Sequence, residues 1–334
     1  MSSEKAIKSK PEAFKQQTQP WWRWLITILS VGLFVFILYQ SRDDFITTLQ
    51  TASPGLALAG LALLFLSRQV VTARWHALLK IAEKPISYWE TIRLTYAGLF
   101  ATNFLPTSIG GDLVRFIGTT QAGVDSALVL ASLIMDRVVG LVGMSIMVPG
   151  GLLLISRSIA VGSEIPSLAI SFTGFTDFFG KLWKKGIGYL QKTFKDILFW
   201  LKHPKNLFYA FLFTLMHELL LFGMYWFFLQ SVGEDVPYWT IAFLYSLSYL
   251  ATLIPLSIGG LGIQEMSITY LYSNFAGVTV QAALALAVLS RLAFVINSLP
   301  GAFFLPAILK FNGRQREAVP ESFDKKSDDK TSRD

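Results

Sequence analysis

The sequence contains no cysteine and only three histidines, and these absences remove several kinds of chemistry at once. A chain without cysteine forms no disulfide and offers no thiolate as nucleophile or metal ligand. The histidines, His76, His203 and His217, lie far apart and lack the spacing of a metal centre. The glycine-rich phosphate loop of nucleotide hydrolases is also missing. We therefore expect no metal, no cofactor, no catalytic residue and no ATP hydrolysis by this chain.

Charged side chains are scarce as well. They make up 15% of the sequence, against roughly 25% in an ordinary soluble domain. Hydrophobic residues make up 53%, and the mean hydropathy is +0.49. A soluble fold of 334 residues needs a charged surface that this composition does not supply. The net charge is +7, and the basic residues that produce it lie beside apolar segments. This position indicates contact with anionic lipid headgroups rather than with nucleic acid.

Long apolar runs indicate the fold class. A helix that crosses a bilayer needs about 20 mostly apolar residues, whereas strands of a membrane barrel alternate apolar and polar residues. The continuous runs are Trp24–Tyr39, Leu56–Val71, Leu207–Leu229, Trp239–Leu256, Ala127–Ile155 and Val278–Leu309. Each of the last two contains an arginine and fits either one tilted helix or two shorter pieces. We predict an all-α polytopic membrane protein with about six to eight membrane-embedded helices.

Two polar tails flank the apolar region. Residues 1–20 are basic and precede a cluster of tryptophans, as at a membrane interface. Residues 311–334 mix both signs of charge with few apolar residues, so we expect this tail to be disordered. The positive-inside rule places both tails in the cytoplasm.

The membrane domain is expected to cover residues 21–310, with two halves at about 54–156 and 207–310. Residues 157–205 connect the halves, and their second part interleaves lysines with aromatic residues. This pattern predicts an amphipathic helix on the cytoplasmic surface, with an ordinary solvated linker helix as the alternative.

An internal repeat marks the two halves. Residues 105–111 read LPTSIGG and residues 254–260 read IPLSIGG. Proline and paired glycines break helices, and broken backbone is tolerated in a membrane only where protein or water satisfies its polar groups. The predicted helix breaks are at Pro106, Gly110, Gly111, Pro255, Gly259 and Gly260. Matching interruptions of this kind are typical of a transporter's binding site.

The charge of the connectors indicates that the halves are inverted. The helix before Pro106 follows the basic connector Arg74–Arg93, so it should run outward from the cytoplasm. The helix before Pro255 begins beside Glu234 and Asp235, in a connector without lysine that should be external. We therefore predict inverted repeats, as in many secondary transporters.

A small set of ionisable residues within the apolar segments could bind a headgroup. Each costs about 2.5–3.5 kcal/mol in the membrane and so requires a compensating contact. The candidates are Asp112, Arg115, Asp136, Arg137, Glu218, Glu265 and Arg291. Of these, we predict headgroup binding for Asp112, Arg115, Arg137, Glu265 and Arg291. Arg115 could bind an anion while Asp112 positions it. Alternatively, the two form a local i,i+3 ion pair in which Asp112 caps its helix.

Arg137 and Arg291 occupy corresponding places in the two halves. A guanidinium group matches two phosphate oxygens at once, so both arginines are candidates for holding a phosphate. The alternative is a structural ion pair with Asp136, Glu218 or Glu265. Glu265 itself could bind a cationic group, couple transport to protons, or cap its helix.

Both motif regions are similar to those of one protein family. Asn103–Arg115 together with Ala131–Leu141 resembles the first signature of the lysylphosphatidylglycerol synthase transmembrane-region family. Pro255–Glu265 resembles its second signature, except that Gln264 stands where arginine is common. The resemblance covers residues 24–309, which is most of the chain.

This resemblance implies a role in lipid transport. The family includes the membrane half of bacterial multiple peptide resistance factors, a flippase for aminoacylated phosphatidylglycerol, whose separate soluble domain performs the aminoacyl transfer. We expect a stand-alone member without that domain, in the cytoplasmic membrane of a prokaryote. The expected partners are membrane lipids with an anionic or lipid-linked headgroup and a separately encoded lipid-synthesis enzyme, but no nucleic acid.

We therefore expect a lipid translocase, and not an enzyme, that moves a phospholipid or lipid-linked intermediate across the membrane. Two alternatives stay open from the sequence. One is a membrane-embedded transferase that acts on lipid-linked substrates. The other is a non-catalytic membrane partner of a lipid-modifying enzyme.

Overall fold

The computed structural model describes residues 21–40, 42–104, 110–160, 200, 202–253, 257 and 260–308 of the chain. All regular secondary structure within these residues is helical, which confirms the predicted all-α class. The predicted tails, 1–20 and 311–334, lie outside the described residues. Pro106, Pro255 and Gly259 also lie outside them, whereas Gly110, Gly111 and Gly260 are described.

Ten named helices are described along the chain. They are α1 (Trp21–Gln40), α2 (Arg42–Thr51), α3 (Pro54–Leu79), α4 (Tyr88–Phe104), α5 (Gly110–Gln121), α6 (Ser126–Ala160), α8 (Pro204–Ser231), α9 (Tyr238–Leu253), α10 (Ile263–Phe275) and α11 (Val280–Ser298). A further short helix covers residues 301–308. Thr279 is the N-cap residue of α11: its hydroxyl accepts from the amide of Ala282 at 3.3 Å and so satisfies a donor that the helix leaves unpaired.

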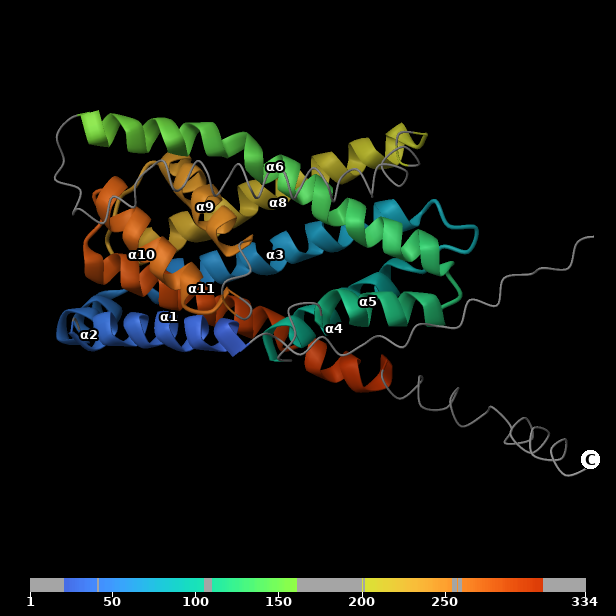
Figure 1. Ribbon diagram of the computed structural model, residues 1–334, viewed down its shortest axis with the longest axis horizontal. Helices are drawn as coiled ribbons and strands as arrows, with labels where there is room; N and C mark the ends of the chain where they lie inside the picture. The colour runs from blue at the N-terminus through green and yellow to red at the C-terminus, as the bar shows by residue number, and fades with distance from the viewer. Residues whose placement is uncertain are drawn as a thin grey trace, which may run out of the picture.

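Four of the described helices are long and apolar enough to cross a membrane. They cover Pro54–Leu79, Ser126–Ser158, Pro204–Ser231 and Val280–Ser298. At about 1.5 Å per residue, even the shortest, with 19 residues, approaches the hydrocarbon thickness of about 30 Å. These helices lie along the long axis of the molecule (Figure 1). The chain is therefore a multi-pass membrane protein.

The helices α3 and α8 lie side by side through the centre of the molecule (Figure 1). Glycine allows this close approach, because a side chain at Gly60 would meet the Phe228 ring and one at Gly223 would meet Leu63. Small residues are common at such contacts in membranes, where lipid provides no hydrophobic force between helices. The apolar interior of the second half, including the fully buried Tyr225, packs around α8.

Two shorter helix pairs occupy opposite halves of the long axis. Figure 1 shows α4 and α5 in one half and α9 and α10 in the other. The end of α4 and the start of α5 lie near the middle of the molecule, as do the end of α9 and the start of α10. Each pair therefore runs from its own end of the molecule to the middle and back.

Some segments differ from their prediction. Arg74 lies inside α3 and is buried, whereas the sequence pattern placed it at the start of a polar connector. Of the two alternatives for the run Val278–Leu309, the structure shows two shorter pieces, because α11 ends at Ser298 and a turn precedes residues 301–308. Most of the predicted connector 157–205, including the segment expected to form an amphipathic helix, lies outside the described residues.

The helices α4 and α5 touch at a pair of glycines. A Cβ atom at Gly111 would lie 2.6 Å from the carbonyl oxygen of Gly98 and 2.1 Å from Thr102 Oγ1. A Cβ atom at Gly98 would lie 2.9 Å from the carbonyl oxygen of Gly111. Neither position has room for a side chain, so this crossing fixes the direction in which α5 leaves the middle of the molecule.

We expect Gly111→Ala to destabilise the protein by about 1–3 kcal/mol, because the added methyl group overpacks against backbone. The matched control is Gly55→Ala, since Gly55 also occupies the second position of its helix but has nothing within 4 Å of its Cβ position. The control should be neutral or slightly stabilising. Thermal unfolding in detergent measures both variants, and equal unfolding temperatures would contradict the tight crossing.

Candidate functional site

A charged group that we call the arginine–aspartate network centres on Asp136 of α6. The Asp136 carboxylate accepts from Arg74 Nε of α3 at 2.7 Å and from Arg115 Nη2 of α5 at 3.2 Å. All three side chains are at most 10% exposed. Gly140 provides the space, because a Cβ atom there would lie 3.2 Å from Arg74 Nη1. These two contacts hold α3, α5 and α6 together.

Asp112, in the first turn of α5, extends the network to a more open position. It accepts from Arg115 Nη1 at 3.4 Å, and its Oδ2 accepts from Arg137 Nη2 at 2.8 Å and from Arg137 Nε at 3.2 Å. The Arg137 side chain is 61% exposed and that of Asp112 is 28% exposed. We call the Asp112–Arg137 pair open because its side chains are partly exposed, and the contacts at Asp136 closed because their side chains are nearly buried.

The network carries surplus positive charge. Three arginines face two aspartates, which leaves one net positive charge. Arg115 Nε has no hydrogen-bond partner among the residues that the structure describes, and the Arg115 guanidinium lies 3.9 Å from the centre of the Trp75 ring. A surplus cation within a membrane domain favours an anionic ligand, because the arginine fork forms its strongest hydrogen bonds with carboxylate or phosphate.

A second ion pair joins Glu265 of α10 and Arg291 of α11. Arg291 Nε donates to Glu265 Oε1, and Arg291 Nη2 donates to Gln264 Oε1 at 3.3 Å. The other carboxylate oxygen of Glu265 accepts from the Gly262 amide at 2.9 Å, so Glu265 also caps the start of α10. The side chains of Glu265 and Arg291 are 7% and 24% exposed, which makes this pair more closed than Asp112–Arg137.

The Asp112–Arg137 and Glu265–Arg291 pairs have the same construction. In each half an acidic residue stands in the first turn of a short helix after a motif, and an arginine of the following long helix binds it. The sequence separation is 25 residues for Asp112 and Arg137 and 26 residues for Glu265 and Arg291. The pairs lie on α5 and α6 in one half and on α10 and α11 in the other.

The predicted site residues therefore fall into two groups. Asp112, Arg115 and Arg137 lie in the arginine–aspartate network, and Glu265 and Arg291 form the second pair. The i,i+3 contact expected between Asp112 and Arg115 is present. The structural ion pair considered for the two arginines is present for Arg291, which binds Glu265. Arg137 instead binds Asp112, which was not among the partners considered for it. The Oε2 atom of Glu218 has no hydrogen-bond partner among the described residues.

Sequence reasoning missed Arg74 and Arg68, both on α3. Arg74 was assigned to the connector because it follows the apolar run Leu56–Val71. The apolar residues after Arg74 were the available signal that the helix continues to Leu79. Arg68 lies inside that run, and a charge within an apolar run is itself a signal. The contacts of both residues come from helices distant in sequence, which no local pattern reveals.

A row of tyrosines lies between the two ion pairs. The ring centres of Tyr225 and Tyr245 are 4.7 Å apart, and those of Tyr245 and Tyr249 are 6.5 Å apart. Tyr249 is close enough to Arg137 to interact with it electrostatically, and Tyr225 is similarly close to Arg291. The row thus reaches from the first ion pair to the second, across the two halves.

Comparison with known proteins points to one family. The family model described as the lysylphosphatidylglycerol synthase TM region matches residues 23–301. The match contains the whole arginine–aspartate network and the second ion pair. No curated protein matches the chain.

We expect Asp136→Asn to destabilise the protein by about 3–5 kcal/mol, because it leaves Arg74 and Arg115 buried without their carboxylate. Asp43→Asn is the matched control, since Asp43 is 86% exposed and pairs only with its neighbour Arg42 among the described residues. The control should leave the unfolding temperature unchanged. Thermal unfolding in detergent compares the two, and a stable Asp136→Asn protein would show that the network does not hold the helices together.

Proposed function

Because the chain belongs to the lysylphosphatidylglycerol synthase transmembrane-region family, we propose that it is a lipid translocase of the cytoplasmic membrane of a prokaryote. It moves a phospholipid or a lipid-linked intermediate between leaflets and leaves the lipid chemically unchanged. The family is a membrane domain linked to lipid handling, which supports the class of substrate. The open Asp112–Arg137 pair carries the proposal, because it exposes a cation at a helix break inside the membrane domain.

The exposure of Arg137 separates a binding role from a purely structural one. A structural ion pair in a membrane is expected to be closed, as Arg74–Asp136 is, because water and lipid otherwise compete for it. Arg137 instead keeps most of its side chain accessible while its Nε and Nη2 bind one oxygen of Asp112. A lipid phosphate that approaches this side chain meets the surplus positive charge of the network.

The opposite directions of the two helix pairs support an inverted repeat. The Asp112–Arg137 pair belongs to the half that contains α4 and α5, and the Glu265–Arg291 pair to the half that contains α9 and α10. Inverted repeats allow one half to open while the other closes, so that a site near the midplane faces each leaflet in turn. The headgroup would pass between the two pairs while the acyl chains stay in lipid.

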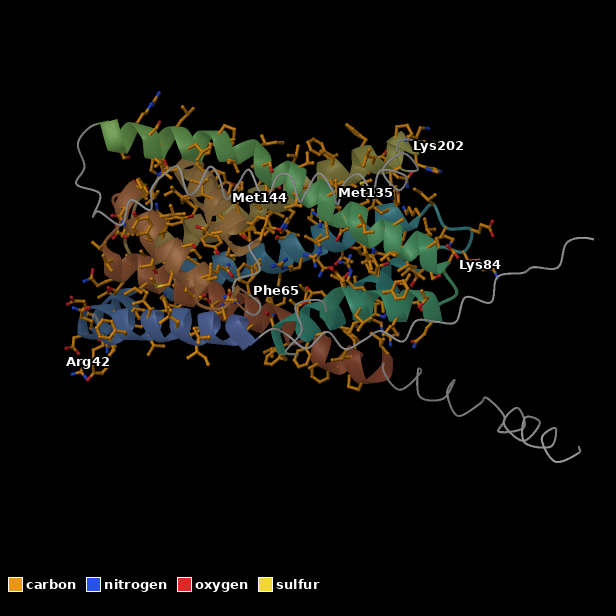
Figure 2. The ribbon with its side chains drawn as sticks, in the orientation of Figure 1. Arg42, Phe65, Lys84, Met135, Met144 and Lys202 are labelled. Carbon is orange, nitrogen blue, oxygen red and sulfur yellow. The ribbon has the colours of Figure 1, made fainter. Side chains whose placement is uncertain are left out.

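The distribution of charge supports an orientation for this movement. Figure 2 shows Lys84 and Lys202 at one end of the long axis and Arg42 at the other. Arg42 is adjacent to two aspartates, Asp43 and Asp44, so its end lacks a positive surplus. By the positive-inside rule the end with Lys84 and Lys202 faces the cytoplasm. The α4–α5 pair then enters from the cytoplasmic side.

The test is lipid exchange in liposomes that contain the purified protein. A fluorescent phosphatidylglycerol is the probe, and a membrane-impermeant reductant reports how much label has reached the outer leaflet. The protein should accelerate exchange without altering the lipid. Arg137→Ala should slow exchange at least about tenfold, because the phosphate loses a charge-assisted contact. Arg157→Ala, in the exposed last turn of the same helix, is the control and should exchange normally.

Each outcome distinguishes the proposal from the other functions considered. Normal exchange with Arg137→Ala would remove Arg137 from the mechanism. A chemically modified lipid in the wild-type liposomes would indicate a transferase instead. Neither exchange nor modification, with phosphatidylglycerol and with other anionic lipids, would leave a non-catalytic partner of a lipid-modifying enzyme as the better explanation.

A further inference from the structure

Arg68 is a charged residue of the interior that the two ion pairs leave unexplained. It lies in the middle of the 26-residue helix α3, one turn beyond Phe65, which Figure 2 places near the centre of the molecule. Within the described part of the chain, no carboxylate lies in ion-pair distance of Arg68 and no side chain is hydrogen-bonded to its guanidinium. Its nearest described aromatic contact is Phe294, whose ring centre is 5.3 Å from the guanidinium carbon.

The other arginines in the interior differ from Arg68 in this respect. Arg74 and Arg115 bind Asp136, Arg137 binds Asp112, and Arg291 binds Glu265; these contacts are the ion pairs described above. A cation at the middle of a membrane helix is costly unless an anion or water compensates it. A contact with the face of an aromatic ring offsets only part of that cost. Arg68 is thus a partly exposed cation without an anionic partner among the described residues, and an anionic ligand would compensate its charge.

The surroundings of Arg68 suit an oxyanion. Tyr96, Tyr225 and Tyr245 are all close enough to interact with Arg68 electrostatically. The hydroxyl of Tyr96 accepts from Gln69 Nε2 at 2.9 Å, which leaves its own proton available to donate. Hydroxyl donors beside a guanidinium group are the arrangement that a phosphate group, with several acceptor oxygens, can use.

We infer that Arg68 is a third anion-binding point, which holds a phosphate in addition to the Asp112–Arg137 and Glu265–Arg291 pairs. Tyr225 and Tyr245, which interact electrostatically with Arg68, belong to the tyrosine row described above. The identification of this phosphate as a lipid headgroup rests on the proposed function, whereas the chemistry alone also fits free phosphate.

Binding to the purified full-length protein in detergent tests the inference. The probes are dihexanoylphosphatidylglycerol, inorganic phosphate, and dihexanoylglycerol, which lacks the phosphate. Arg68→Met keeps the length of the side chain but removes the charge, and it should weaken binding of dihexanoylphosphatidylglycerol about tenfold. Arg157→Met, in the exposed last turn of α6, is the matched control and should bind normally. Isothermal titration calorimetry measures the dissociation constants.

Stability separates a ligand-binding role from a structural one. Because Arg68 has no anionic partner in the described part of the chain, Arg68→Met should not lower the unfolding temperature of the ligand-free protein. If Arg68→Met does not fold, Arg68→Gln replaces it in the binding measurement with the same expectation. Wild-type affinity in the folded neutral variant would overturn the inference. Competition by inorganic phosphate would show that the site accepts free phosphate, and its absence that it requires the lipid.

The liposome assay keeps this inference separate from the proposed function. If the wild-type protein moves no lipid but Arg68→Met loses binding, the anion site stands and the translocase proposal fails. If the wild-type protein moves lipid and Arg68→Met both binds and moves it normally, the translocase proposal stands and the role of Arg68 is refuted.

Discussion

The contact of Asp136 with two arginines is the interaction on which the site depends. It ties α5 to α3 and α6, and α5 carries Asp112 in its first turn. The position of Asp112 in turn sets where the Arg137 fork lies. When a carboxylate is buried between two guanidinium groups, removing any one of the three groups destabilises the fold, because it leaves an uncompensated buried charge. The closed part of the network therefore positions the open part.

The two ion pairs share a construction but not an exposure. Glu265 is nearly buried, and one of its carboxylate oxygens accepts a hydrogen bond from the amide at the start of α10. Asp112 is partly exposed and binds two arginines. The structure thus shows one pair open and its counterpart closed. The translocase proposed above requires such a difference between its two pairs in any single state, because both sides of the membrane must not be open together.

Much of this fold could be predicted from the sequence, because long apolar runs and helix-breaking motifs depend on local chemistry. The central runs became α3, α6, α8 and α11, and the i,i+3 relation of Asp112 and Arg115 followed from helix geometry alone. The partner of Arg137 could not be predicted, because several acids were equally plausible and only the packing of α5 on α6 selects Asp112. Arg74 was missed for the same reason: its partner, Asp136, lies 62 residues away.

The glycine contact between α4 and α5 also limits how the protein can move. The carbonyl oxygens of Gly98 and Gly111 face positions that have no room for a Cβ atom, so the two helices are in backbone contact here. A displacement of Asp112 relative to α4 would therefore break this contact, whereas a joint displacement of α4 and α5 would preserve it. Segments 80–87 and 122–125 connect this helix pair to α3 and α6.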